Sequence, residues 1–496
     1  MAAPKIVAAK CPTCGANLPV PSGVLQVICR YCQNAIQVEH RKPPPEVVPF
    51  GAPGAMPSRT LYIDPAADKA AQRIASGVVY IIYGAMLLPI VVPIVIFVGP
   101  WALRSCKSAF RPFPVACDTN EEVEVSGNFE TTGPLVTRVG HNCKLHIKNA
   151  KLKGSSLVKT DAFNMELTLD NVTIETTEPM IQAGSNLKVT LHGSTLTSAA
   201  PVFDNDTNME LDVESSTIES KGAAAIKSKY NLKVRMEDGK IRGKKAGIDA
   251  DANTELTMKK GSEVTSSEGP AVKTTSNFKL QADGGKLDGG LVLDSSCELV
   301  ATGLTLTAKE KAIAATSSLK LDWTDGSITS AADVAIDADS STNLTLTNTK
   351  VQGATTAINC EGSSKIKASK KTRIVGLTGN GVTTTSNSEL VLNDAALEAG
   401  AKAFKGSDNT KIKLGQGARI AGKKAGIETE GNTELEATGA TLEGGAGPAI
   451  QAGYNAQLDF KQSLVKGTPA IQLDRKPLRV TVDETRIEGE RKIAGR

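Results

Sequence analysis

A short pattern of polar and apolar residues recurs from about Asp118 to the end of the chain. From a polar residue at position 0, apolar residues follow at +3 and +5 and usually at +10, as in NMELTLDNVTI from Asn164 and NLKVTLHGSTL from Asn186. Apolar residues two positions apart lie on one face of a β-strand, so the pattern predicts strands rather than helices. Ser, Thr, Gly, Asn and Asp fill the stretches between these strands.

The polar residue at position 0, here called the corner residue, marks seventeen successive units. The spacing between corners stays between 19 and 24 throughout. A longer internal repeat supports this division into units, because the hexapeptide GKKAGI at Gly243 occurs again at Gly422, eight units later. Twelve corner residues are Asn and four are Ser; the seventeen are Asn120, Asn142, Asn164, Asn186, Asn208, Asn231, Asn253, Asn277, Ser296, Ser318, Ser341, Ser363, Asn387, Asn409, Asn432, Asn455 and Pro477.

Sustained periods of 20 to 50 residues indicate a stacked architecture. The pattern resembles a right-handed parallel β-helix of the pectate-lyase type, in which each turn contributes three short strands that pair with the turns above and below. Asn suits a corner because it tolerates the left-handed backbone conformation, and stacked amides can hydrogen-bond along the rod. The Leu-x-x-Leu-x-Leu signature of leucine-rich repeats is absent, and a 22-residue turn does not divide into the hexapeptides of left-handed β-helices.

We therefore expect an all-β solenoid over residues 118–496, a right-handed parallel β-helix of about 17 turns with about 22 residues per turn. At ~4.8 Å per turn the rod would be about 80 Å long. Its regular apolar positions would fill the interior. A small N-terminal zinc ribbon and one transmembrane helix complete the predicted fold.

Two cysteine pairs in residues 1–40 have the spacing CxxC-x14-CxxC: Cys11 with Cys14, and Cys29 with Cys32. Two such knuckles can supply four thiolates in a tetrahedron, which is the preferred arrangement for structural Zn2+. The segment resembles a zinc ribbon, and LPVPSGVLQVI between the pairs is expected to form a hairpin. A redox CxxC or two disulfides are the alternatives, but the segment lacks the βαβ pattern of a redox motif.

Four thiolates leave no open position on the metal, so we expect this zinc to be structural rather than catalytic. A segment this short buries too little surface to fold alone, and the metal would hold it together. Such a ribbon can dock proteins or contact nucleic acid, and the structural or protein-docking role is favoured.

Residues 41–76 form a Pro-rich linker and a juxtamembrane segment, and residues 77–103 are predicted to form a transmembrane helix. The stretch from Gly77 to Val98 carries no charge and, as a helix, would be about 33 Å long. Pro89 and Pro93 predict a kink near its middle. A re-entrant hairpin and a buried apolar helix are the alternatives to a single span.

The composition changes with these boundaries. Residues 1–117 hold 11 Lys and Arg against 4 Asp and Glu, whereas residues 118–496 hold 46 against 49. The long part therefore gives no electrostatic reason to expect nucleic-acid binding. Aromatic residues make up only 4% of the chain, which is low for a compact enzyme core and for sugar binding by ring stacking.

Residues 104–117 are expected to connect the span to the rod and to cap its first turn.

Candidate catalytic groups in the repeat region are few. Carbohydrate cleavage needs paired carboxylates, or a carboxylate cluster that holds calcium beside a base. The local aspartate pairs precede corners, where Asp commonly satisfies turn amides. No catalytic motif is assigned, and the even spacing leaves no long loop to wall a cleft, which argues against an enzyme. The pairs are Asp204 with Asp206, Asp249 with Asp251, and Asp337 with Asp339.

The remaining candidates are single residues. His141, His146 and His192 fall near the first turns, the latter two at outward positions without an evident partner. Trp323 stands at an apolar +5 position and is expected inside. Five cysteines outside the ribbon have no motif, so no disulfide framework is predicted: Cys106, Cys117, Cys143, Cys297 and Cys360.

Three functions are compatible with the sequence. The leading hypothesis is a non-catalytic, membrane-anchored binding or scaffold protein with a cytoplasmic zinc ribbon and a rod, outside the cytoplasm, that can bind a protein or glycan. The alternatives are a membrane-anchored glycan-active enzyme of the lyase or hydrolase type, and a cytoplasm-facing scaffold held by a membrane hairpin. The flanking charges of the span are balanced and do not decide its orientation. The combination of domains resembles proteins of bacteria.

Overall fold

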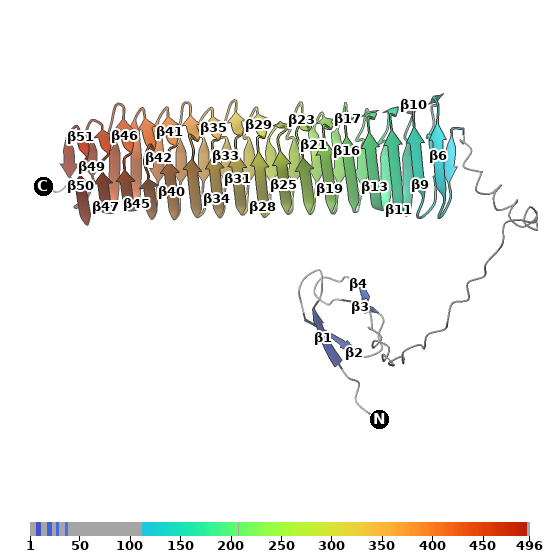
Figure 1. The fold of residues 1–496 in the computed structure, drawn as a ribbon, viewed down its shortest axis with the longest axis horizontal. Coiled ribbons are helices and arrows are strands. Elements are labelled where there is room, and N and C mark those ends of the chain that lie inside the picture. The colour runs from blue at the N-terminus through green and yellow to red at the C-terminus, as the bar shows by residue number, and fades with distance from the viewer. Residues whose placement is uncertain are drawn as a thin grey trace, which may run out of the picture. The chain divides into compact units, whose positions relative to one another are not determined.

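The computed structural model describes residues 112–206 and 208–493, together with four short strands in the N-terminal part. Residues 112–493 form a right-handed parallel β-solenoid of about 17 turns with about 22 residues per turn (Figure 1). Each turn contributes three strands, one to each of three parallel sheets, which confirms the fold predicted for this part of the chain. No connection between consecutive strands from β5 to β52 exceeds five residues.

Sheet 1 contains the strand that follows each corner residue. At all seventeen turns this strand begins within two residues after the predicted corner, or runs through it. Its strands are β6 (Glu122–Ser126), β9 (Lys144–Lys148), β11 (Val158–Asp170), β13 (Ile181–His192), β16 (Met209–Glu214), β19 (Leu232–Glu237), β22 (Thr254–Met258), β25 (Phe278–Asp283), β28 (Cys297–Thr302), β31 (Leu319–Thr324), β34 (Thr342–Thr347), β37 (Ser364–Ser369), β40 (Ser388–Asn393), β43 (Thr410–Leu414), β45 (Ala425–Thr438), β47 (Ile450–Lys461) and β50 (Arg479–Asp483).

Sheet 2 follows in each turn and carries the apolar side chain that usually stands at position +10, and at +11 for Val264, Ile374 and Ile420. Its strands are β7 (Phe129–Glu130), β10 (Lys151–Gly154), β12 (Thr173–Thr176), β14 (Thr195–Ser198), β17 (Thr217–Ser220), β20 (Lys240–Gly243), β23 (Glu263–Ser266), β26 (Lys286–Asp288), β29 (Thr305–Ala308), β32 (Ser327–Ser330), β35 (Lys350–Gly353), β38 (Arg373–Gly376), β41 (Ala396–Ala399), β44 (Arg419–Gly422), β46 (Thr441–Gly444), β48 (Leu464–Lys466) and β51 (Arg486–Glu488).

Sheet 3 closes each turn and leads into the next corner. The N-terminal halves of β11, β13, β45 and β47 belong to it, because these long strands continue through the corner into sheet 1. Its other strands are β5 (Val115–Cys117), β8 (Val136–Val139), β15 (Phe203–Asn205), β18 (Ala224–Ser228), β21 (Ala246–Ala250), β24 (Val272–Thr274), β27 (Leu291–Leu293), β30 (Ile313–Ala315), β33 (Ile336–Ala338), β36 (Ile358–Cys360), β39 (Val382–Thr384), β42 (Lys402–Gly406), β49 (Ile471–Leu473) and β52 (Arg491–Ile493).

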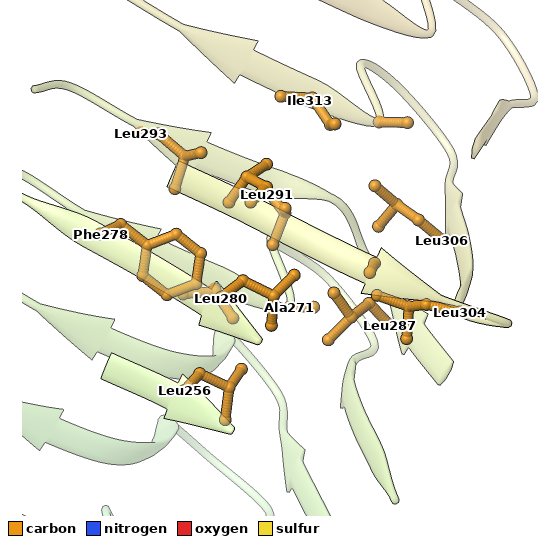
Figure 2. Close-up of a cluster of buried hydrophobic side chains, with 14 of the residues drawn as sticks. Leu256, Ala271, Phe278, Leu280, Leu287, Leu291, Leu293, Leu304, Leu306 and Ile313 are labelled. Atoms are coloured by element: carbon orange, nitrogen blue, oxygen red, sulfur yellow. The ribbon is translucent and has the colours of Figure 1, made fainter. Parts of the chain in front are cut away.

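The apolar positions of the repeat fill the interior, as predicted. In the turn that begins at Asn208, Leu211, Val213 and Ile218 occupy the three apolar positions of the pattern, and all three are buried. Equivalent side chains of neighbouring turns stack on one another along the rod (Figure 2). Trp323 is buried as expected, and its indole N–H donates to the Leu304 carbonyl at 3.2 Å.

A second bend, between sheets 1 and 2, was not predicted. One residue there has a positive φ in every one of the seventeen turns, seven or eight positions after the corner residue. Gly, Asn and Asp fill most of these positions because they adopt this conformation at little steric cost. The residues are Gly127, Asn149, Asn171, Gly193, Ser215, Asp238, Gly261, Gly284, Gly303, Asp325, Asn348, Lys371, Asp394, Gly417, Gly439, Gln462 and Glu484.

A disulfide joins Cys117 and Cys143 at the first turns of the rod, with the Cα atoms 6.0 Å apart. The expectation of no disulfide is therefore wrong at this pair. The two cysteines are 26 residues apart, one turn plus a few residues, so the stacking of turns brings them together. Cys297 and Cys360 are buried free thiols.

In the N-terminal part, strand β1 (Ile6–Lys10) pairs antiparallel with β2 (Asn17–Pro21), and β3 (Gln26–Ile28) with β4 (Ala35–Gln37). The hairpin expected between the cysteine pairs would have joined β2 to β3. The observed pairings instead join the strands on either side of each CxxC, so that expectation is wrong. Cys11, Cys14, Cys29 and Cys32 themselves lie outside the described residues.

Among the residues that the structure describes, none belongs to a helix long and apolar enough to span a membrane. The predicted linker 41–76, the predicted span 77–103 and most of the connector 104–117 lie outside these residues.

Candidate functional site: a groove along the asparagine corner

The corner residues form a column of side chains along the rod. In the N-terminal turns each corner amide donates from Nδ2 to the Oδ1 of the corner residue one turn earlier, from Asn142 onto Asn120 at 2.7 Å up to Asn277 onto Asn253 at 3.0 Å. The ladder resumes after Asn387 and ends with Asn455 donating to Asn432 at 2.7 Å. The predicted stacking of corner amides is confirmed in both segments.

Four consecutive serines separate the two amide ladders. Ser296, Ser318, Ser341 and Ser363 are all exposed. A serine side chain is shorter than an asparagine side chain, so the corner residues project less far from the rod in these turns. The run of serines is visible in the sequence. Only the stacking of the turns shows that it lies between two ladders of amides.

The residues at +2 form a second column beside the first, here called the +2 column. Its members stack in register in the parallel sheet 1, so each lies next to its counterpart one turn away. Their charges alternate between Glu and Lys over the first ten turns and again from Lys365 to Glu434. The column is Glu122, Lys144, Glu166, Lys188, Glu210, Lys233, Glu255, Lys279, Glu298, Lys320, Asn343, Lys365, Glu389, Lys411, Glu434, Gln457 and Arg479.

Neighbours in the +2 column form ion pairs. Lys320 lies 2.7 Å from Glu298, and Lys411 lies 2.7 Å from Glu434. The hydrogen bond from the paired lysine lowers the pKa of Glu298 and of Glu434 below the ordinary value of 4.5. These pairs are partly exposed, so each contributes little stability alone. The alternation keeps like charges two turns apart and leaves the column close to neutral.

A groove of about 1370 Å³ runs beside these two columns from the turn of Asn253 to the turn of Leu478. Its lining comes from positions 0, +1 and +2 of eleven successive turns. The corner amides and hydroxyls offer hydrogen-bond donors and acceptors at a constant step, and the +2 column lines it with alternating charge. No catalytic residue was predicted here, and the signal that could have revealed the groove is the alternation of Glu and Lys at +2.

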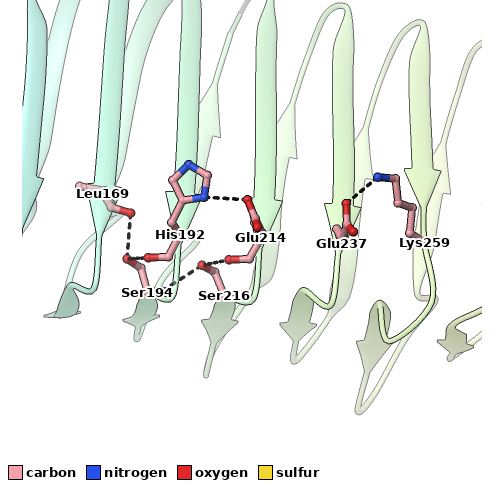
Figure 3. Close-up of polar contacts among 7 residues, drawn as sticks. All are labelled: Leu169, His192, Ser194, Glu214, Ser216, Glu237 and Lys259. Carbon is pink, nitrogen blue, oxygen red and sulfur yellow. Dashed lines mark hydrogen bonds and ion pairs between the residues drawn. The ribbon is translucent and has the colours of Figure 1, made fainter.

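The histidines of the first turns have partners, contrary to the expectation. His146 Nε2 lies 2.5 Å from Asp170 Oδ2, and His192 Nδ1 lies 2.9 Å from Glu214 (Figure 3). His141 stacks on the Phe163 ring with the ring centroids 3.8 Å apart. Both carboxylate partners come from the following turn, so their distance along the chain hides them in the sequence.

Buried hydroxyls support the second bend behind these histidines. Ser194 Oγ donates to the carbonyls of Leu169 and His192, each at 2.9 Å, while the Ser194 N–H donates to Ser216 Oγ at 2.9 Å (Figure 3). Ser216 repeats the contact with the Glu214 carbonyl at 2.7 Å. The His192 and Glu214 carbonyls also accept the backbone N–H groups of Asn171 and Gly193, so each serine hydroxyl adds a second hydrogen bond at the bend.

The aspartate pairs are not brought together into one acidic site. Asp204, Asp249 and Asp337 point outward from sheet 3, and each stacks against a residue of another type: Asp204 lies in register with Lys227, and Lys227 in turn with Asp249. Asp337 lies 2.5 Å from Lys311, and Asn359 donates to it at 2.8 Å.

The second members of the pairs follow the strands. Asp206 lies 2.7 Å from Lys229. Asp251 and Asp339 follow the ends of β21 and β33, and their backbone N–H groups donate to the Ser228 and Ala315 carbonyls of the preceding turns. In residues 112–206 and 208–493, no group of three or more His, Cys, Asp or Glu side chains is arranged to hold a metal ion.

The two free thiols are held in the interior. Burial raises the pKa of Cys297 to about 11 and that of Cys360 to about 12. A protonated, enclosed thiol is a poor nucleophile. Both residues therefore act as small apolar side chains of the core.

Comparison of the chain with protein-family models, with curated proteins and with solved structures finds no match.

Proposed function

We propose that the protein is a non-catalytic, membrane-anchored β-helical binding protein, whose rod binds an extended, uncharged glycan chain in the groove along the asparagine corner. The observation that carries the proposal is the groove itself, which extends over eleven turns with the same kinds of side chain. A surface that repeats at each turn can make the same contacts with each unit of a polymer. The short connections between strands leave the groove unobstructed along its length.

The chemistry of the lining favours a neutral glycan. The exposed amides and hydroxyls at position 0 can exchange hydrogen bonds with sugar hydroxyls, while the alternating Glu and Lys of the +2 column cancel one another's field. A polyanion such as nucleic acid binds mainly through an excess of Lys and Arg, which this column does not offer. Among the described residues, Phe278 is the one aromatic side chain in the lining, and it is buried, so each sugar would bind weakly and affinity would come from many turns acting together.

The location proposed for the rod is outside the cytoplasm. The disulfide between Cys117 and Cys143 supports it, because structural disulfides persist in oxidising compartments and are rare in the cytosol. The apolar stretch from Gly77 to Val98 would supply a single span. The alternative with rod and ribbon together in the cytoplasm lacks this support.

The four ribbon cysteines are proposed to hold one structural Zn2+ on the cytoplasmic side. In chain order Cys11 and Cys14 fall between the paired strands β1 and β2, and Cys29 and Cys32 between β3 and β4. A CxxC between two antiparallel strands is the arrangement in which a knuckle turn presents both thiolates to one metal. Both pairs have this setting.

The test is retention of the purified full chain, in detergent, on insoluble cellulose and chitin. The groove is obstructed with Ser318→Tyr together with Ser341→Tyr, and the matched control is Thr302→Tyr, an exposed residue at the far edge of sheet 1 outside the groove. We expect the groove variant to lose at least fivefold in retention and the control to match the original protein. Equal retention of the groove variant, or binding to heparin alone, would overturn the proposal.

The same experiment addresses the glycan-active alternative. Release of soluble sugar from cellulose or chitin by the original protein would show an enzyme. Asp337→Asn would then be the first variant to compare, since its side chain is only 14% exposed.

A further inference from the structure

The last turn of the rod is uncovered, unlike every turn before it. Val480 and Val482 occupy the inward +3 and +5 positions of β50, yet each is 37% exposed. Their counterparts one turn earlier, Leu458 and Phe460, are 0% and 1% exposed. Ile493 in β52 is 40% exposed and Leu478 before β50 is 64% exposed. The cross-section of the solenoid is thus an apolar face at this end.

The strands of the last turn are also paired on one side only among the residues that the structure describes. β50 pairs with β47, β51 with β48 and β52 with β49. An unpaired strand edge beside apolar side chains is a template for pairing with another strand.

The opposite end of the rod is closed. Val123 and Val125 hold the same +3 and +5 positions in the first turn and are only 3% and 0% exposed. Phe113 packs on Phe129 there, with the ring centroids 5.8 Å apart, and the nearby disulfide ties the segment to the rod. A second rod is therefore not expected to add head to tail.

The sequence of β50 is self-complementary. It reads Arg479-Val480-Thr481-Val482-Asp483, so an antiparallel copy centred on Thr481 places Arg479 opposite the partner's Asp483 and valine opposite valine. Opposite charges and β-branched pairs across antiparallel strands are stabilising. The same arrangement repeats on both sides of a two-fold axis, as an isologous interface requires.

We propose that two copies of this chain associate tail to tail through the last turn of the rod, with β50 paired antiparallel to its counterpart in the partner. The interface buries the valines and Ile493 and completes the open strand edges. One turn of about 22 residues is comparable to the roughly 20–30 residues that each partner contributes to a standard interface. A two-fold contact closes on itself, so it yields a dimer and no fibre.

The test measures the mass of the purified full chain in detergent by sedimentation velocity, corrected for the micelle, with charge-exchange variants. Arg479→Asp places two carboxylates opposite each other across the two-fold axis, and Asp483→Arg places two guanidinium groups there. The double variant, R479D with D483R, restores opposite charges between the copies. Inside each copy the double variant still places like charges together, because residue 479 lies beside Asp459 and residue 483 lies in register with Lys461. Recovery of the dimer in the double variant would therefore come from contacts between the copies.

We expect the original protein to be dimeric, each single variant to weaken dimerisation at least tenfold, and the double variant to return to within threefold of the original. Circular dichroism on each variant checks that the rod is folded. A monomeric original protein at tens of micromolar would overturn the proposal. So would a double variant weaker than either single one, or a species that grows in length with concentration.

Discussion

At the scale of the residue, the two bends of each turn place different demands on the chain. The corner asparagines share an amide ladder, but among them only Asn120, Asn142, Asn164, Asn186 and Asn455 have a positive φ. The second bend has a positive φ in every turn, and its residue type varies more. Sequence reasoning found the corner because Asn repeats there, and it missed the second bend because Gly, Asn, Asp, Ser, Lys, Gln and Glu share its positions.

Asp238 allows the requirement for a positive φ at the second bend to be tested apart from core packing. Its φ is 51° and its side chain is exposed. We expect Asp238→Val to destabilise this turn by about 1–2 kcal/mol, because a β-branched residue is strained in the left-handed region, while Asp238→Gly should change stability by less than about 1 kcal/mol. Hydrogen exchange of amides around β19 and β20 measures the effect locally, since a stack of turns need not unfold in one step. Equal protection in both variants would contradict this account.

The buried thiols give a second prediction at this scale. Because burial raises the pKa of Cys297 to about 11 and of Cys360 to about 12, both stay protonated at pH 8. We expect N-ethylmaleimide to leave both unmodified in the folded protein and to modify both in guanidinium chloride, read by peptide mass mapping. Rapid labelling of either residue in the folded protein would show that the interior opens there.

At the scale of the element, the strands of the rod were predictable because their apolar residues alternate and recur. Seventeen corners could be placed from sequence because one short pattern was repeated without insertions. The contacts between turns were not predictable in the same way. His146 and Asp170 are 24 residues apart in the chain, and Cys117 and Cys143 are 26 residues apart, so only the stacking of turns makes them neighbours.

The +2 column makes the stability of the rod depend on acid. The hydrogen bond from a lysine of a neighbouring turn lowers the pKa of Glu298, Glu389 and Glu434 below the ordinary value of 4.5, and a hydrogen bond from Arg235, outside the column, lowers that of Glu210. A depressed carboxyl pKa stabilises the folded state above the unfolded-state pKa, and this contribution is lost as the pH falls through the folded-state pKa. We therefore expect the thermal midpoint to be steady from pH 7 to about pH 5 and to fall below about pH 4.5.

A variant with Glu298→Gln and Glu434→Gln provides the control for that titration. It should have a lower midpoint at pH 7 and a smaller fall on acidification, because two of the titrating pairs are gone. Added salt should reduce the difference between the proteins by screening the exposed charges. An unchanged acid profile in the variant would exclude the +2 column as a source of the acid sensitivity.

At the scale of the whole molecule, the disulfide ties the first turns of the rod together. Reduction, or Cys143→Ser with Cys117→Ser, removes a cross-link that closes a loop of about 26 residues, and such a loss costs about 3 kcal/mol. We expect faster exchange and earlier proteolysis in β5 to β9, with the turns after β20 unaffected, since each turn contacts only its neighbours. Uniform loss of protection along the rod would contradict a local role.

The disulfide also tests the arrangement of the chain across a membrane. A thiolate zinc site is expected in a reducing compartment and a structural disulfide in an oxidising one. If the stretch from Gly77 to Val98 is a single span, the ribbon and the rod satisfy both conditions at once. We therefore predict that Cys117 and Cys143 are joined in the full chain as expressed in cells, and are reduced when that stretch is deleted and the chain stays in the cytoplasm.

The measurement uses acid quenching of bacterial cells that express the full chain, followed by labelling of free thiols with a mass-tagged maleimide under denaturing conditions. The single variants Cys117→Ser and Cys143→Ser mark the mobility of a chain in which this disulfide cannot form. Protease protection of a C-terminal tag gives an independent readout, since a rod outside the cytoplasm is cleaved once the outer envelope alone is opened. Full labelling of both cysteines together with a protected tag would place ribbon and rod on the same side, with Pro89 and Pro93 then favouring a membrane hairpin.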